Sequence, residues 1–305
     1  MIFVSLTTIR SRLERLDEIL ASLLHQSRSP DAILLNVSHE PFLLDEGIDE
    51  PDLERFTTAV VRNDDRIRVR FVENLGSYRK IVPALESVRD PDDIIVTADD
   101  DIPYAPHWLE RLVEQVRDTP ATPAYRCRQL SWDGACLRPY EKWPFVGDGV
   151  VPAEPEPRLD LLPTSGAGIA FRRGYFDESD PLDELRRLAP MQDDIALRLL
   201  MLSKNVAVAW RPSDAHGERF EEFRSHENAV DLYRHNRRAD WLGRTPNDAA
   251  LRRVAALLAP RARSPEAREW FERIRRGTAL PRRIDRRLRE LYWEYRSARR
   301  REAAH

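Results

Sequence analysis

This chain of 305 residues contains only two cysteines, three lysines and 11 glycines, and it has no long uncharged apolar run. Two cysteines cannot build the disulfide framework of a small secreted domain. No segment approaches the ~18–20 apolar residues that a membrane-spanning helix needs. Residues 1–6 lack the basic and apolar regions of a signal peptide. We therefore expect a cytoplasmic protein.

The surroundings of the cysteines argue against even one bridge. Asp133-Gly134 predicts a hairpin turn that pairs Ser131 with Cys136. Cys127 is then out of register with Cys136. We expect two free thiols in a reducing compartment.

Charge is unevenly distributed along the chain. The net charge is -3, yet residues 251–305 carry 17 arginines and 7 acidic residues. The aromatic residues among these arginines are Trp270, Phe271, Tyr292, Trp293 and Tyr295. We expect them to pack on the parent domain while arginine stems cover the remaining surface. The alternatives are peripheral contact with the inner face of a membrane and a homodimer interface. Nucleic-acid binding is not expected, because nothing else in the chain supports it.

Short β-branched segments alternate with amphipathic ones through the first two thirds of the chain. This pattern predicts an α/β fold with a mixed, mainly parallel sheet flanked by helices. The predicted strands are Ile2–Leu6, Ala32–Val37, Ile67–Val72, Asp93–Ala98, Ala124–Arg128, Gly168–Phe171 and Val206–Trp210. The predicted helices are one that starts with a Ser11/Glu14 capping box, followed by Asp52–Arg62, Tyr78–Val88, Pro106–Arg117 and Asp193–Leu202.

Strand signals end near Glu221, after which only helices are predicted. We therefore divide the chain into a domain of residues 1–225 and a helical, arginine-rich extension of residues 226–305. A long proline-rich segment, Pro139–Pro163, has no clear period. Segments of this kind form lids or binding loops, or they are disordered.

The most informative segment is the run Asp99-Asp100-Asp101, which directly follows a predicted apolar strand. Ligands bind at the carboxyl ends of strands in open α/β sheets. Like charges this close repel one another unless a cation or hydrogen-bond donors offset them. Carboxylate oxygens suit Mg²⁺ or Mn²⁺, which also bridge to substrate phosphates. The alternative is an aspartate that caps the helix beginning near Pro106. One cap needs one aspartate, so we favour a metal site.

Five blocks of sequence, in order, resemble GT-A fold glycosyltransferases, in particular family 2-like bacterial members. Residues 99–101 at a strand end resemble the DxD motif of these enzymes, which use nucleotide-diphosphate sugars. The other four blocks are residues 4–10, Gly76–Lys80 before a helix, Ser165–Gly168 before a strand and Gln192–Ile195 at a helix start. The resemblance covers residues 1–225 and implies a donor half, 1–104, and an acceptor half, 105–225.

The resemblance also implies roles for individual aspartates. Asp99 would contact the ribose side of the nucleotide, Asp101 would hold the metal on the diphosphate, and Asp100 would flank or share that metal. Asp193-Asp194 resembles the Glu-Asp pair of the family, whose second member is the general base of inverting transfer. Acids in the first turn of a helix are also favoured by the helix dipole alone. Which of the two is the base stays open here, because the first position is Asp instead of Glu.

The loop after the first strand offers Thr7, Thr8, Arg10 and Arg12. Their hydroxyl and guanidinium groups suit base, ribose and phosphate oxygens. The arginines fit a solvated helix face equally well. No G-x-G-x-x-G motif is present, which disfavours a dinucleotide-binding site.

Three further positions are candidates. Lys80 at a helix start opposes the helix dipole, a cost that a diphosphate or carboxylate would remove; a surface charge is the alternative. Gly166 lets backbone approach a ligand closely, and the resemblance implies that it lines the donor sugar and acceptor pocket. His216 follows the last predicted strand and is a candidate Mn²⁺ ligand, with His226 and His235 as rivals.

We therefore expect a metal-dependent glycosyltransferase that moves a sugar from a UDP- or GDP-sugar, with inversion, to a hydroxyl of a glycan, lipid-linked or small-molecule acceptor. The segment Pro139–Pro163 would order over the donor and exclude water. One alternative is a phosphohydrolase or nucleotidyltransferase that uses Asp99–Asp101, although no nucleophile or second metal site is evident. The other is a non-catalytic sugar-nucleotide-binding protein.

Overall fold

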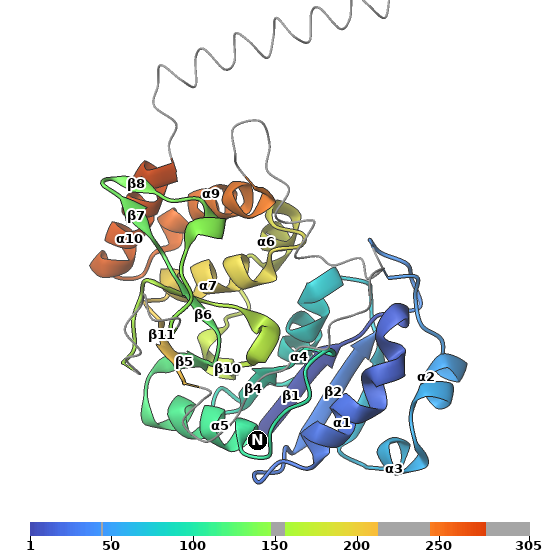
Figure 1. Cartoon of the computed structure of the whole chain (residues 1–305). Coiled ribbons are helices and arrows are strands. Elements are labelled where there is room, and N and C mark those ends of the chain that lie inside the picture. Colours follow the sequence, from blue (N-terminus) through green and yellow to red (C-terminus); the bar gives the residue numbers. More distant parts are fainter. Residues whose placement is uncertain (44, 148–155, 213–244, 279–305) are drawn as a thin grey trace, which may run out of the picture.

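The computed structural model describes residues 1–43, 45–147, 156–212 and 245–278. Its centre is a seven-stranded sheet in the order β11-β5-β10-β4-β1-β2-β3 (Figure 1). β10 runs antiparallel to β4 and β5, and the other neighbouring pairs are parallel. These strands are β1 (Ile2–Thr7), β2 (Ala32–Val37), β3 (Ile67–Phe71), β4 (Ile94–Thr97), β5 (Ala121–Ala124), β10 (Ile169–Arg172) and β11 (Ala207–Trp210). The predicted mixed, mainly parallel α/β architecture is confirmed.

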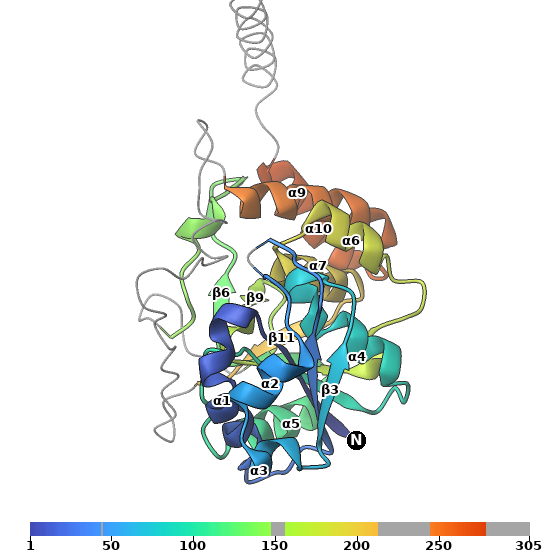
Figure 2. The same ribbon diagram turned by 90° about the vertical axis from the view of Figure 1, so that its right-hand side faces the viewer.

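Helices cover both faces of the sheet, as the apolar strands β2 and β4 require, since both are buried along their whole length. One face carries α1 (Leu16–Leu24), α2 (Glu50–Phe56), α3 (Ala59–Arg62) and α5 (Trp108–Asp118); the other carries α4 (Val82–Ser87), α6 (Leu182–Leu188) and α7 (Asp193–Ser203). Figure 2 shows β3 with α1 and α2 on one side and α4 on the other. The chain thus builds two hydrophobic cores, one on each face.

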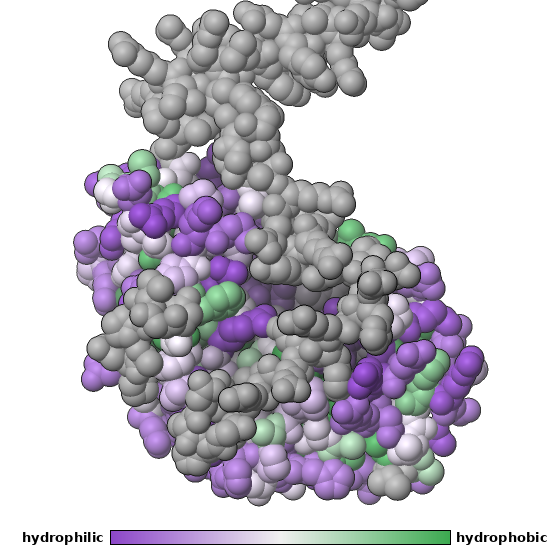
Figure 3. All heavy atoms as spheres, viewed as in Figure 1, coloured by the Kyte–Doolittle hydropathy of each residue, from purple (hydrophilic) through white to green (hydrophobic). Residues whose placement is uncertain are grey.

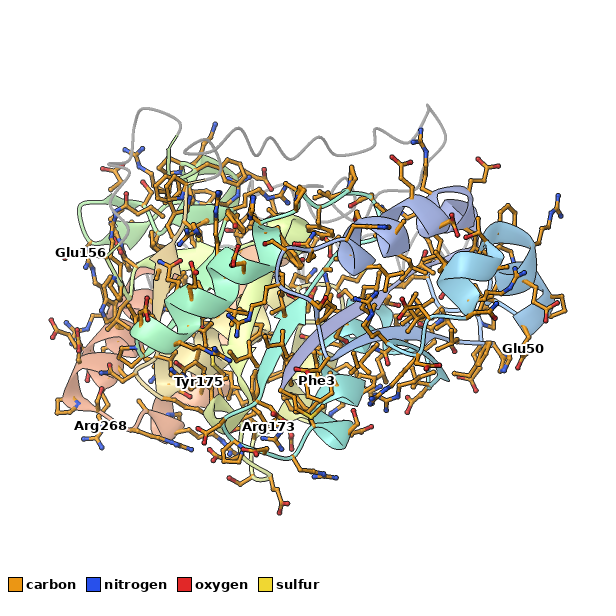
Figure 4. The ribbon with its side chains drawn as sticks, turned by 90° about the horizontal axis from the view of Figure 1, so that it is seen from below. Phe3, Glu50, Glu156, Arg173, Tyr175 and Arg268 are labelled. Carbon is orange, nitrogen blue, oxygen red and sulfur yellow. The ribbon has the colours of Figure 1, made fainter. Side chains whose placement is uncertain are left out.

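Two C-terminal helices extend the second core. α9 (Pro246–Leu258) and α10 (Pro265–Thr278) pack on each other and on α7. The predicted packing holds for Phe271, which is buried in the same cluster as Leu200 of α7. In Figure 4, Arg268 of α10 and Glu50 of α2 lie at opposite ends of the molecule, with Phe3 of β1 between them. These two helices therefore belong to the folded body.

Three helix predictions need correction. The helix predicted at Tyr78–Val88 is instead a 3₁₀ helix, η2 (Gly76–Lys80), followed by α4, so Lys80 ends the 3₁₀ helix and does not begin an α-helix. The capping box of Ser11 with Glu14 is wrong, because the chain enters a 3₁₀ helix, η1 (Arg10–Arg15), in which Ile9 is the N-cap and no side chain caps. The single helix predicted at Asp52–Arg62 is divided into α2 and α3. Thr57 and Thr58 between them are extended, and the Thr58 hydroxyl accepts a hydrogen bond from Val61 N at 3.4 Å. An N-cap residue needs an extended backbone, so the cap of α3 at Thr58 interrupts the helix.

The strand predicted at Ala124–Arg128 is wrong as one element. β5 ends at Ala124, and β6 (Cys127–Gln129) pairs instead with β9 (Leu161–Pro163), outside the central sheet. The segment Pro139–Pro163, predicted to be a lid, contains a 3₁₀ helix, η3 (Tyr140–Lys142), and ends with β9. Residues 148–155 of that segment lie outside the described ranges.

The hairpin forms near the predicted place but in another register. β7 (Trp132–Asp133) and β8 (Cys136–Leu137) pair so that Asp133 faces Cys136. The turn is therefore one residue later than predicted, because Gly134 with its positive φ of 56° takes the first turn position. Both cysteines are free, as predicted, with Cys127 buried and Cys136 exposed.

Among the described residues, no helix is long and apolar enough to cross a membrane. The described residues visible in Figure 3 are mostly hydrophilic, and the apolar ones among them form small separate patches. Several candidates lie outside the described residues: His216, His226, His235, Tyr292, Trp293 and Tyr295.

Candidate active site

Three segments that are distant in the sequence meet at one edge of the sheet. β4 lies between β1 and β10, with Thr97 paired to Ser5 on one side and to Ile169 on the other. Because β10 is antiparallel, its start lies beside the ends of β1 and β4. The loop after β1, residues 99–101 and residues 165–168 are thus brought together, as the sheet-edge argument predicts.

Hydrogen bonds hold both the backbone and the side chain of Asp99. Its backbone N–H donates to the Tyr104 hydroxyl at 2.7 Å, and its Oδ1 accepts from Lys80 Nζ at 2.9 Å. Lys80 comes from the 3₁₀ helix η2 (Gly76–Lys80), where it is buried. Its Nζ also lies 3.8 Å from Asp193 Oδ2. Lys80 therefore bridges the acidic triplet and the acidic pair of α7.

Lys80 and the carboxylates of this bridge stabilise one another's charged forms. Burial alone would lower the pKa of Lys80, but the carboxylates of Asp99 and Asp193 raise it. Burial would likewise raise the pKa of Asp99, but the Lys80 ammonium lowers it. Lys80 and Asp99 are therefore both ionised at neutral pH.

Asp100 and Asp101 share one arginine. Arg12 Nη1 lies 2.6 Å from Asp100 Oδ1 and 3.1 Å from Asp101 Oδ2. Asp100 is buried, whereas the side chains of Asp99 and Asp101 are 22% and 29% exposed. The outer two carboxylates of the triplet are therefore those that a ligand can reach.

Asp193 and Asp194 begin α7 but have different partners. Asp193 Oδ1 accepts from Ser77 Oγ at 2.6 Å, and its buried Oδ2 accepts no hydrogen bond from any described residue. Asp194 is partly exposed, and its Oδ1 accepts from Ser165 N at 3.2 Å. Burial and then the Asp193 carboxylate raise the pKa of Asp194 to about 7. Asp194 can thus take up and release a proton near neutral pH.

The predicted site residues in the loop after β1 have different partners. Thr7 Oγ1 donates to Asn36 O at 2.8 Å, and Thr8 is buried beside it at the sheet edge. Arg10 turns away towards α2, where Nη2 lies 2.7 Å from Asp52 Oδ2. Of the two arginines, it is therefore Arg12 that contacts the acidic triplet.

Gly166 lies in close contact with the guanidinium group of Arg126. A Cβ at this position would lie 2.3 Å from Nη2 of Arg126. Arg126 Nε donates to Thr164 Oγ1 at 2.7 Å, and its charge helps to lower the pKa of Asp99. No sequence signal pointed to Arg126, because it fell inside a predicted strand. Tyr104 and Ser77 were also assigned no role, although Ser77 lies in one of the five blocks.

The carboxylates of Asp99 and Asp101 have the chemistry to bind a divalent metal ion together with ligands from another molecule. Among the residues that the structure describes, no three His, Cys, Asp or Glu side chains gather to hold a metal by themselves. Asp99 and Asp101 nevertheless offer partly exposed carboxylate oxygens. Mg²⁺ is usually held by one or two carboxylates together with substrate phosphates. The donor set therefore suits a metal ion that takes its remaining ligands from outside the chain.

Comparison with solved structures shows the fold. TarS of S. aureus matches with a TM-score of 0.51 and 14% identity, over 93% of this chain and 44% of that chain. TarS 1–349 in complex with UDP matches with a TM-score of 0.47 and 14% identity, over 90% and 69%. The 2-C-methyl-D-erythritol 4-phosphate cytidylyltransferase of Francisella tularensis matches with a TM-score of 0.38 and 13% identity, over 68% and 89%. No protein-family model and no curated protein matches the sequence. The chain has a GT-A-like α/β fold.

Proposed function

We propose that this chain is a glycosyltransferase that moves a sugar from a nucleotide-diphosphate sugar to an acceptor hydroxyl with inversion. One observation carries the proposal. Asp194, a carboxylate whose pKa is raised to about 7, directly follows Asp193, and Lys80 links Asp193 to Asp99 of the acidic triplet. This arrangement supports a donor site at the triplet with a general base beside it.

The donor would lie across the ends of β1 and β4. Thr7 and Asp99 would contact the nucleoside, since hydroxyl and carboxylate oxygens suit base and ribose hydrogen bonds. Thr8 is buried and would support this loop from below the surface. Arg12 and Lys80 supply positive charge beside the triplet. Guanidinium and ammonium groups are the usual partners of phosphate oxygens.

Asp99 and Asp101 would hold Mg²⁺ or Mn²⁺ together with the diphosphate. When bound, the metal ion supplies positive charge that stabilises the leaving diphosphate. The support for it is the chemistry and partial exposure of these two carboxylates.

Asp194 is the better base of the acidic pair. Asp193 is buried and already accepts from Ser77, while Asp194 is partly exposed and titrates near neutral pH. A general base works best when its pKa lies close to the working pH. Asp194 would take the proton of the acceptor hydroxyl as that oxygen bonds to the anomeric carbon. The bond from this carbon to the diphosphate oxygen breaks, and its electron pair leaves with the diphosphate.

Ligand-dependent stability tests the donor site. Thermal unfolding of the wild type is measured with UDP, GDP, CDP and dTDP, each with and without Mn²⁺. A bound ligand stabilises the folded protein by about 2.7 kcal/mol at 100 times its dissociation constant. We expect a Mn²⁺-dependent increase in Tm with one nucleotide, and we expect Asp101→Asn to lose it.

Asp118→Asn, which changes an exposed aspartate at the end of α5, is the matched control and should keep the increase. If no nucleotide raises the Tm of the folded wild type, the donor site is wrong. If the increase persists without metal and in Asp101→Asn, the chain binds nucleotides but the metal assignment is wrong.

A further inference from the structure

Arg12 reaches the acidic triplet because of where β1 ends. η1 follows β1 after two residues, and β1 is hydrogen-bonded to β4, which the triplet follows. A single guanidinium nitrogen of Arg12 contacts both Asp100 and Asp101. The Arg12 side chain is 30% exposed, so it has an open side towards solvent as well as a carboxylate side.

Arg12 and a metal ion would compete for the same oxygens. Nη1 lies 3.1 Å from Asp101 Oδ2, which is one of the oxygens that would ligate a metal. Two cations this close repel each other, and the repulsion is stronger in a partly buried site than in water. A metal ion that ligates Oδ2 of Asp101 therefore displaces the guanidinium from this oxygen.

A bound diphosphate would offer the Arg12 guanidinium an alternative hydrogen-bond acceptor. Phosphate oxygens accept two parallel N–H bonds from a guanidinium, as a carboxylate does. Arg12 is partly exposed. Side-chain rotations at such positions are fast, so the guanidinium could exchange the carboxylates for a diphosphate bound beside the triplet.

We propose that Arg12 couples metal binding to donor binding. Without a donor, Arg12 pairs with Asp100 and Asp101 and disfavours metal binding to them. When a donor binds, its diphosphate takes the place of these carboxylates as the partner of Arg12. The inference rests on the proposed metal-dependent function and goes beyond it by making Arg12 a positioning residue for the metal ligands. Because binding free energies are linked, the metal must raise donor affinity by the same factor by which the donor raises metal affinity.

Mn²⁺ binding without nucleotide tests this directly. Electron paramagnetic resonance of free Mn²⁺ gives its dissociation constant for the wild type, Arg12→Gln and Arg12→Lys. Coupling factors between two sites are typically about 5–150-fold. We expect Arg12→Gln to bind Mn²⁺ alone about tenfold more tightly than the wild type, within that coupling range. Arg12→Lys, which keeps the positive charge, should stay closer to the wild type.

Arg15→Gln is the matched control, since Arg15 lies in the same 3₁₀ helix and pairs with Glu18 at 3.2 Å. It removes the same net charge and should bind Mn²⁺ like the wild type. The titrations are repeated with UDP and with GDP. The role of Arg12 is wrong if the wild type and Arg12→Gln bind Mn²⁺ equally without nucleotide and both bind it more tightly with UDP or GDP. That result leaves the proposed function intact. Absence of Mn²⁺ binding by every variant, with or without nucleotide, removes the metal from the proposed function and this inference with it.

Discussion

Asp193 and Asp194 are adjacent in the chain, yet their surroundings give them different properties. Asp193 accepts a hydrogen bond from Ser77 and lies near Lys80, so its negative charge has partners. Asp194 lies beside that charge in a mostly buried position, and its pKa is raised to about 7. Burial and the neighbouring charge thereby suit Asp194 to proton transfer near neutral pH.

The raised pKa has a consequence for stability. Between its ordinary value of 3.8 and about 7, folded Asp194 keeps a proton that the unfolded chain releases. The folded state then binds more protons, so this group makes stability fall as pH rises through that range. Asp194→Asn removes the penalty. We expect the variant to match the wild type in Tm near pH 4 and to exceed it at pH 8, measured by thermal unfolding across pH.

Asp183→Asn, which changes an aspartate of the first turn of α6, is the control and should follow the wild type at both pH values. A Tm of Asp194→Asn that lies below the wild type at pH 8 would contradict the burial of an uncompensated charge at this position.

At the scale of elements, local patterns predicted the pieces of the site but not the contacts between them. Apolar runs placed β4 and α7, and with them residues 99–101 and 193–194 at element ends. The contact of Ser77 with Asp193 joins residues 116 positions apart. It depends on how α7 packs beside η2, which no local periodicity encodes. Arg126 lies against Gly166 for the same kind of reason.

The start of β10 depends on one glycine, Gly168. Gly168 has a φ of 98°, and a Cβ there would lie 2.6 Å from Cζ2 of the buried Trp108. Trp108 Nε1 in turn donates to Ala167 O at 2.8 Å. We expect Gly168→Ala to lower the free energy of unfolding by about 3 kcal/mol, from backbone strain together with overpacking, as measured by urea denaturation.

Gly134→Ala is a matched comparison, because Gly134 also has a positive φ but no heavy atom lies within 4 Å of the position that a Cβ would take. Backbone strain alone predicts a loss of about 1 kcal/mol there. Equal losses for the two variants would show that the tight contact with Trp108 does not constrain β10.

At the scale of the whole molecule, the sheet and the C-terminal helices form one hydrophobic body. α9 starts with a capping box of Thr245 and Asp248, and Asp248 Oδ1 also accepts from Tyr140 N at 2.8 Å. α10 contributes the buried Phe271 to the core that covers the α7 face of the sheet. The position of α7, and so of the acidic pair, therefore depends on helices at the far end of the described chain.

A core truncation in α10 tests this dependence. Phe271→Ala should lower the free energy of unfolding by about 3–5 kcal/mol, as for other buried phenylalanines. Glu269→Ala, at an exposed position of the same helix, should stay within about 0.5 kcal/mol. Urea denaturation followed by circular dichroism measures both. A separate early transition for α10, with the remainder of the protein unaffected, would contradict a shared core.

The most direct measurement is turnover of nucleotide sugars. Release of nucleoside diphosphate from a panel of UDP- and GDP-sugars with Mn²⁺, water serving as acceptor, is followed by mass spectrometry for the wild type, Asp194→Asn and the control Asp183→Asn. We expect turnover of one donor, a loss of about 10²–10⁴-fold in kcat for Asp194→Asn, and little change in nucleotide affinity. Turnover by Asp194→Asn equal to that of the wild type would contradict the assignment of the general base.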